Sequence, residues 1–250
     1  MNIPCRELKR ISRENLTFHY TIPMGVFFTG IMIPLLMELP FASLQDQYAT
    51  RLQTGIFFVA EFLISIFSAV LTFGEYYMHL NMARKKTYTF SDLFYPVKNR
   101  SEVFLPAACL LAVVGLIGNA PALAGIYLLS EHRSLTAILP AVSGIVLSLI
   151  LSYVIRVEFL LLYFVLLDHR DMGLLAAIKL ARELLRGNRG RLWYVYLSFL
   201  GMQILSVLSL TVGFLWVSPY CKQTLANFYL SVSGTMPAPQ TVGQTFNQAV

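Results

Sequence analysis

Charge is scarce in this sequence. Only 13% of its 250 residues are Asp, Glu, Lys or Arg, whereas 56% are hydrophobic. An average soluble domain has about 25% charged residues. So little charge does not cover a soluble globular surface, and the composition therefore indicates an integral membrane protein.

Motifs of enzymatic chemistry are also missing. The sequence has no HExxH, GxSxG, P-loop or GxGxxG pattern, each of which would point to a known class of catalytic or nucleotide-binding site. Its three cysteines, Cys5, Cys109 and Cys221, have neither an even count nor the spacing of metal ligands. We therefore expect no enzyme activity, no catalytic residues, no cofactor, no metal site and no disulfide framework.

Long apolar runs are what the sequence does contain. A helix needs about 20 apolar residues to cross the hydrocarbon core, and several runs reach that length. They predict an all-α polytopic membrane bundle of about five transmembrane helices plus basic interfacial helices, in a single integral membrane domain over residues 1–230. Residues 231–250 are uncharged and rich in Thr, Gln, Gly and Pro, which predicts a disordered polar tail. The predicted spans are residues 20–41, 55–79, 103–129, 136–167 and 192–217.

Lys and Arg are distributed unevenly about these runs. Fifteen of the 19 lie before the first run, between the second and third, and between the fourth and fifth. Because cytoplasmic loops carry an excess of Lys and Arg, we expect a plasma-membrane protein with a cytoplasmic N-terminus and an extracellular C-terminus. No groove-reading motif accompanies the basic charge, so we expect membrane lipids, or another membrane or cytoplasmic protein, as partners, and no nucleic acid.

Each basic segment precedes an outward run and has the character of an interfacial helix. The segments suggest a repeated unit of interfacial helix, span out and span back, which occurs twice and is then half-completed. In the last segment, Gly187 is placed to end the helix in a left-handed conformation. The basic side of this helix either binds anionic lipid or a cytoplasmic partner, or only anchors the topology. That side consists of Lys179, Arg182 and Arg186, opposite an apolar side of Leu174, Ile178, Ala181 and Leu185.

A polar stripe follows the second predicted span at intervals of three and four residues, which places it on one helix face. Such a face avoids lipid and meets protein or water. It is either a structural contact or a relay for protons or ions. The stripe consists of Glu61, Ser65, Ser68, Thr72, Glu75 and His79.

The fourth predicted span carries small residues at every fourth position, Gly144, Ser148 and Ser152, followed by Arg156. Small residues at this spacing let another helix approach closely. We predict an ion pair between Glu75 and Arg156, because both lie twenty residues after the start of their spans. Glu158 points about 200° away from Arg156, so we expect it to reach toward the interface or a basic interfacial helix. The third span contains Gly115, Gly118, Asn119 and Pro121, which predict a kink.

The last third of the sequence carries a recognisable pattern: an acidic turn, a helix ending in Arg-Gly-Asn, an aromatic-rich span, and a Thr-x-Ala-x-Phe-Tyr end. In this pattern the chain resembles a bacterial multi-pass membrane family known as domain of unknown function nine-seven-five. Wider relatives include the membrane domain of some glycerophosphodiester phosphodiesterases, a portion without the catalytic residues. The resemblance implies a helical membrane module without an assigned activity. The matching positions are Asp168, Arg186, Gly187, Asn188, Trp193, Ser198, Phe199, Gly201, Trp216, Pro219, Tyr220, Thr224, Ala226, Phe228 and Tyr229.

Two hypotheses of function follow from these features. The first is a non-enzymatic module that binds lipid or a partner through its basic interfacial helices. The second is a small-solute or ion transporter, or a channel, that uses the polar stripe of the second span. A water-filled cavity at Glu61 or Glu75 would favour transport, and a closed interior would favour the binding module.

Overall fold

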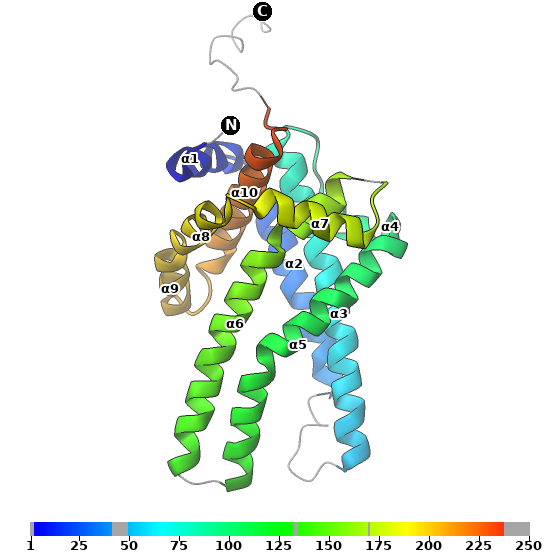
Figure 1. The fold of residues 1–250 in the computed structure, drawn as a ribbon, viewed down its shortest axis with the longest axis vertical. Helices are drawn as coiled ribbons and strands as arrows, with labels where there is room; N and C mark the ends of the chain where they lie inside the picture. Colours follow the sequence, from blue (N-terminus) through cyan, green and yellow to red (C-terminus); the bar gives the residue numbers. More distant parts are fainter. Residues whose placement is uncertain (1–2, 42–49, 133–134, 170, 238–250) are drawn as a thin grey trace, which may run out of the picture.

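The computed structural model describes residues 3–41, 50–132, 135–169 and 171–237, and over these residues the protein is all-α (Figure 1). Its long helices are α2 (Thr21–Glu38), α3 (Arg51–Ala83), α5 (Ser101–His132) and α6 (Leu135–Asp168). The shorter elements are α1 (Cys5–Leu16), η2 (Phe90–Phe94), α4 (Tyr95–Lys98), α7 (Leu174–Leu185), α8 (Arg189–Leu197), α9 (Leu200–Leu208) and α10 (Phe214–Ser233).

Five segments are long and apolar enough to cross a membrane, so the protein is a multi-pass helical membrane protein. Four of them agree closely with the predicted spans, and the fourth predicted span is one continuous helix, α6. The segments are Thr21–Phe41, Arg51–Ala83, Ser101–Leu129, Ile138–Asp168 and Arg189–Leu208.

The fifth predicted span, residues 192–217, was wrong in its course. The chain is broken between α8 and α9, and after Leu208 it reverses direction, so that α10 runs back beside α9 and ends near α1 (Figure 1). Leu210 and Thr211 take positive φ angles of 52° and 69° in this reversal. A side chain on Gly213 would place its Cβ 2.8 Å from the Cα of Ser206, so only glycine fits this tight turn.

This reversal also corrects the predicted topology. The end of α10 lies at the same end of the molecule as α1 (Figure 1), so the expectation of a C-terminus opposite to the N-terminus does not hold for α10. After α7 the chain continues through α8 and α9, and α10 then returns toward α1. The predicted tail begins within α10, which continues to Ser233, and residues 238–250 lie outside the described part.

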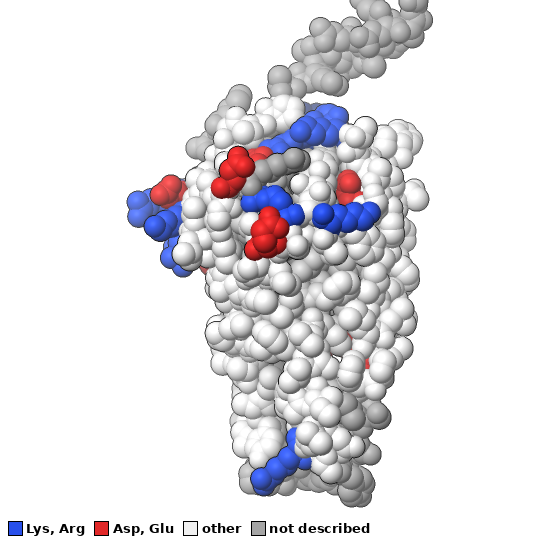
Figure 2. All heavy atoms as spheres, turned by 90° about the vertical axis from the view of Figure 1, so that its right-hand side faces the viewer, with Lys and Arg blue, Asp and Glu red and all other residues white. Residues whose placement is uncertain are grey.

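The molecule has two different ends. The short helices α1, α4 and α7 gather at one end, here called the basic end, and the long helices extend to the other, here called the far end (Figure 1). On the face in Figure 2, charged side chains gather toward one end and most of the remaining surface is uncharged. This distribution suits a protein whose long apolar part lies in lipid.

The hydrophobic core is concentrated in the half of the molecule next to the basic end. Residues 70–83 of α3 are nearly all buried there, whereas its first residues are exposed. Residues 223–231 of α10 are buried on every side, which makes α10 the central helix of this half. Aromatic rings join the neighbouring helices, as where Phe164 stacks on Tyr229 with centroids 5.2 Å apart. The η2 turn packs so closely that a Cβ on Gly74 would lie 1.8 Å from the carbonyl oxygen of Leu93.

The predicted close approach on the fourth span is confirmed, and its partner is α5. A Cβ on Gly144 would lie 2.3 Å from the carbonyl oxygen of Pro121. Ser148 Oγ accepts a hydrogen bond from the backbone amide of Ala122 at 2.8 Å, in the turn that follows Pro121. The third span is one continuous helix that changes direction along its length (Figure 1). The small residues therefore hold α5 and α6 together as a hairpin.

Candidate functional site

The face of α7 that points away from the core carries the predicted basic residues. Lys179, Arg182 and Arg186 are all exposed, and Leu175, one turn before Lys179, is 77% exposed. The spacing of these four residues places them along one side of the helix. Sequence reasoning found the three cations and missed the leucine, although its spacing from Lys179 was a usable signal. We call Leu175, Lys179, Arg182 and Arg186 the basic stripe.

The opposite face fastens α7 to the bundle. Ala181 and Leu185 are buried in the main core, and Leu174 and Ile178 pack against it partly buried, which confirms the predicted apolar side; Ala177 is buried there as well. Gly187 has a φ of 82°, so the helix ends in the left-handed conformation that the sequence predicted. Asn188 then donates from Nδ2 to the carbonyl oxygen of Leu184 at 3.2 Å. The Arg-Gly-Asn pattern is therefore the stop of α7 and the start of α8.

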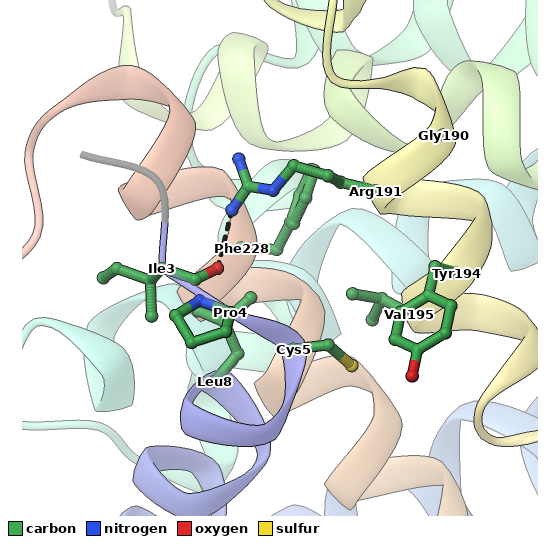
Figure 3. A pocket seen from close by; sticks show the side chains of 9 residues that line it. All are labelled: Ile3, Pro4, Cys5, Leu8, Gly190, Arg191, Tyr194, Val195 and Phe228. Carbon is green, nitrogen blue, oxygen red and sulfur yellow. Dashed lines mark hydrogen bonds between the residues drawn. The ribbon is translucent and has the colours of Figure 1, made fainter.

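A cavity of about 240 Å³ lies between the start of α1 and α8, and Figure 3 shows the side chains that line it. Arg191 donates from Nη2 to the carbonyl oxygen of Ile3 at 2.7 Å and from Nη1 to Asn188 Oδ1 at 3.0 Å. Its guanidinium also lies 5.5 Å from the ring centroid of Phe228. Arg191 thus fastens α1 to α8 and borders the cavity as a cation that already has protein partners.

Lys9 fastens α1 to the next part of the chain. Its Nζ donates to the carbonyl oxygen of Ser198 at 3.0 Å and lies 4.2 Å from the ring centroid of Phe199. The Tyr220 hydroxyl donates to the carbonyl oxygen of Lys9 at 3.4 Å. Burial of the ammonium group lowers the pKa of Lys9 below its usual value. The Ser-Phe and Pro-Tyr positions of the sequence pattern therefore hold the N-terminal helix in place.

In the half of α3 next to the basic end, two residues of the polar stripe belong to a buried cluster. Glu75 is 5% exposed, and its Oε2 forms an ion pair with Lys222 of α10. His79, which is fully buried, donates from Nδ1 to Gln223 Oε1 at 2.9 Å. The predicted pair between Glu75 and Arg156 is therefore wrong. The physical reason is that α10 folds back into the bundle and brings a lysine to the carboxylate.

The rest of the stripe makes local contacts. Ser65 Oγ donates to the carbonyl oxygen of Phe62 at 2.7 Å, and Thr72 Oγ1 donates to that of Ser68 at 2.9 Å. Glu61 is half-buried and lies farther toward the far end on α3. The structure thus separates Glu61 from the cluster of Glu75 and His79 instead of linking them.

Arg156 stands apart from this cluster. It is exposed, and within the part of the chain that the structure describes it forms no hydrogen bond or ion pair. Glu158, two residues on, pairs with Arg189 Nη2 at 3.1 Å, at the start of α8. This pair confirms that Glu158 reaches the basic segment before the fifth span.

Asp168 joins three helix ends at the basic end. Its Oδ1 accepts from Arg84 Nη2 at 2.7 Å, and its Oδ2 accepts from the Tyr229 hydroxyl at 2.7 Å. The side chain of Asp168 is only 18% exposed. The acidic turn and the final tyrosine of the pattern are therefore parts of one contact between α3, α6 and α10.

A second cavity, of about 670 Å³, lies at the far end between α2 and α3, and apolar residues with Arg51 line it. Neither this cavity nor the one at Arg191 is lined by Glu61 or Glu75. Among the described residues, no group of three or more His, Cys, Asp or Glu side chains is placed to hold a metal ion.

Comparison with known proteins gives a family and no activity. Residues 1–236 match the family described as "Protein of unknown function (DUF975)". No curated protein and no solved structure matches the chain. The match extends well beyond the last third in which the sequence pattern was recognised.

Proposed function

Since the chain belongs to the DUF975 family of unknown function, we propose its function from its own geometry: it is a non-enzymatic membrane module that binds anionic phospholipid. The binding surface is the basic stripe of α7, at the cytoplasmic face of a bacterial plasma membrane. The observation that carries this proposal is the alignment of one exposed leucine with three exposed cations on a single helix face.

This combination is typical of helices that lie at the lipid headgroups. An apolar side chain enters the boundary of the acyl chains, and the cations meet the phosphates. In Figure 1, α7 runs across the ends of the long helices and not parallel to them, as an interfacial helix does. The positive-inside rule supports the cytoplasmic side, because α1, α4 and α7 all carry Lys or Arg at the same end.

The strength of this surface follows from its charges. Each Lys or Arg near an anionic membrane contributes about 1 kcal/mol, so the three cations together provide roughly a hundredfold preference for anionic over neutral lipid. Leu175 adds affinity by burying apolar surface, at about 25 cal/mol per Å², and this part does not depend on headgroup charge.

The alternative of transport has less support. It would need water to reach the carboxylates of the α3 stripe, yet Glu75 is 5% exposed and held by Lys222. The hydroxyls of Ser65 and Thr72 are used within their own helix. These contacts suit a face that holds α3 in the bundle.

The test compares two triple variants that remove the same charge. Lys179→Gln, Arg182→Gln and Arg186→Gln remove the cations of the basic stripe. The matched control removes three other exposed cations, by Arg6→Gln, Lys86→Gln and Lys98→Gln, which lie outside α7.

Purified protein is titrated with phosphatidylglycerol and with phosphatidylcholine, and bound lipid is counted by native mass spectrometry. We expect the unchanged protein and the control to prefer phosphatidylglycerol, and the stripe variant to lose most of that preference. A stripe variant that prefers phosphatidylglycerol as strongly as the unchanged protein does would refute the proposal. The proposal would also be refuted if the unchanged protein captured another protein from membrane extracts through the basic stripe and showed no preference between the two lipids.

A further inference from the structure

We infer that Arg156 binds the phosphate group of one phospholipid, held where α5 and α6 separate. This inference rests on the proposed function, because it adds a specific lipid site to a lipid-binding module. It concerns a different helix from the basic stripe and a lipid held singly at a defined place, so the two can be tested apart.

The first step is that Arg156 lacks a protein partner. It lies within the candidate span Ile138–Asp168 and is exposed. In the described ranges it has no ion pair or hydrogen bond, since Glu75 is taken by Lys222. A charged side chain in a candidate span is stabilised by a partner or by the polar membrane surface, and a lipid phosphate supplies both.

The second step is depth. Arg189, whose side chain is 61% exposed, reaches Glu158 of α6, so polar groups at the membrane surface extend to the level of Glu158. Arg156 is two residues closer to the far end, which is about 3 Å along a helix. Arginine extends its charged end well beyond its own Cα. A lipid phosphate is therefore within reach of Arg156 on the outside of α6.

The third step is space beside the arginine. A Cβ on Gly118 would lie 3.0 Å from the side chain of Ile155, so α5 and α6 still touch there. One turn nearer the basic end, a Cβ on Gly115 would meet nothing within 4 Å. In Figure 1 α5 leaves the direction of α6 on its way to α4, so the two helices part toward the basic end.

The fourth step is the surface that would receive the acyl chains. Leu149 and Ile150 of α6 are 67% and 55% exposed, and Ile117 of α5 is 63% exposed. Leu149 and Ile150 lie on the far-end side of Arg156 along α6, and Ile117 precedes Gly118, which meets Ile155, by one residue on α5. A phosphate on Arg156 therefore has exposed apolar side chains of α5 and α6 near it, which suit the acyl chains of a phospholipid.

The experiment counts the phospholipid that stays on the protein through purification in mild detergent, by native mass spectrometry. We expect one phospholipid per chain on the unchanged protein. Arg156→Gln should reduce the retained fraction at least tenfold, and Arg156→Lys should retain more than Arg156→Gln. Gly115→Leu fills the space without changing charge and should also lower retention. Arg51→Gln, at another exposed arginine in a candidate span, is the matched control and should retain the lipid.

Several outcomes would overturn the inference. One is that the Arg156→Gln variant and the Gly115→Leu variant both retain as much lipid as the unchanged protein. Another is displacement of the bound species by inorganic phosphate, which would assign the site to free phosphate. A third is the loss of a copurifying protein, and not of lipid, on Arg156→Gln. The stripe variant of α7 should keep the single lipid. A stripe variant that still prefers phosphatidylglycerol would refute only the proposed function, whereas Arg156 variants that still retain the lipid would refute only this inference.

Discussion

Breaking the ion pair between Glu75 and Lys222 should destabilise the protein strongly. Lys222→Met keeps the apolar stem of the side chain and removes its charge, which leaves Glu75 at 5% exposure without a cation. Removing one member of a buried pair costs about 3–5 kcal/mol. The variant also loses two cation–π contacts of Lys222 Nζ, which lies 5.2 Å from the Phe27 ring and 5.8 Å from the Tyr76 ring. Together these contacts contribute about 0.5–2 kcal/mol.

The measurement is the thermal unfolding midpoint in detergent. For a chain of this size, about 1 kcal/mol shifts the midpoint by roughly 2–4 °C, so Lys222→Met should lower it by at least about 6 °C. The double variant Glu75→Gln with Lys222→Met leaves no buried charge and should recover more than half of the loss. Arg189→Gln removes the exposed partner of Glu158 and should cost less than about 1 kcal/mol. A single variant as stable as the unchanged protein, or a double variant no better than the single one, would refute this account.

Two further predictions concern packing and topology. Gly144→Ala should cost about 1–3 kcal/mol, because its Cβ would lie 2.3 Å from a carbonyl oxygen of α5; Gly115→Ala meets open space and should leave the unfolding midpoint nearly unchanged. Cysteines introduced at Arg6 and at Thr235, in a chain with Cys5 replaced by Ser, should react with an impermeant maleimide from the same side of the membrane, because α1 and the end of α10 are neighbours. Labelling from opposite sides would contradict the course of α10.

Some of the fold was predictable from local sequence. The first four spans depend on runs of apolar residues, and their existence needs no knowledge of neighbouring helices. The stop of α7 at Gly187 was also predictable, because only the local backbone decides whether a glycine takes a positive φ. The same holds for the two faces of α7, which follow from the periodicity of a helix.

The fifth span shows where local patterns fail. Residues 192–217 form an almost unbroken apolar run, so hydropathy gave one helix, whereas the chain turns back at Leu210 and Thr211. The sequence does hold a signal in Ser209 and Gly213, since Ser209 Oγ accepts from the Gly213 amide at 3.0 Å. Such a signal is weak because small polar residues also occur inside transmembrane helices.

The pairing of charges was decided by tertiary structure alone. From sequence, Arg156 was the natural partner of Glu75 because both occupy similar places in their spans. The partner became Lys222 because α10 returns into the bundle, an event that depends on a turn many residues away. Local sequence therefore determined that this chain spans a membrane and which helix faces are polar. Only the packing of distant helices decided that Glu75 meets Lys222 while Arg156 stays exposed, because contact between charges is set by three-dimensional distance and not by position along a span.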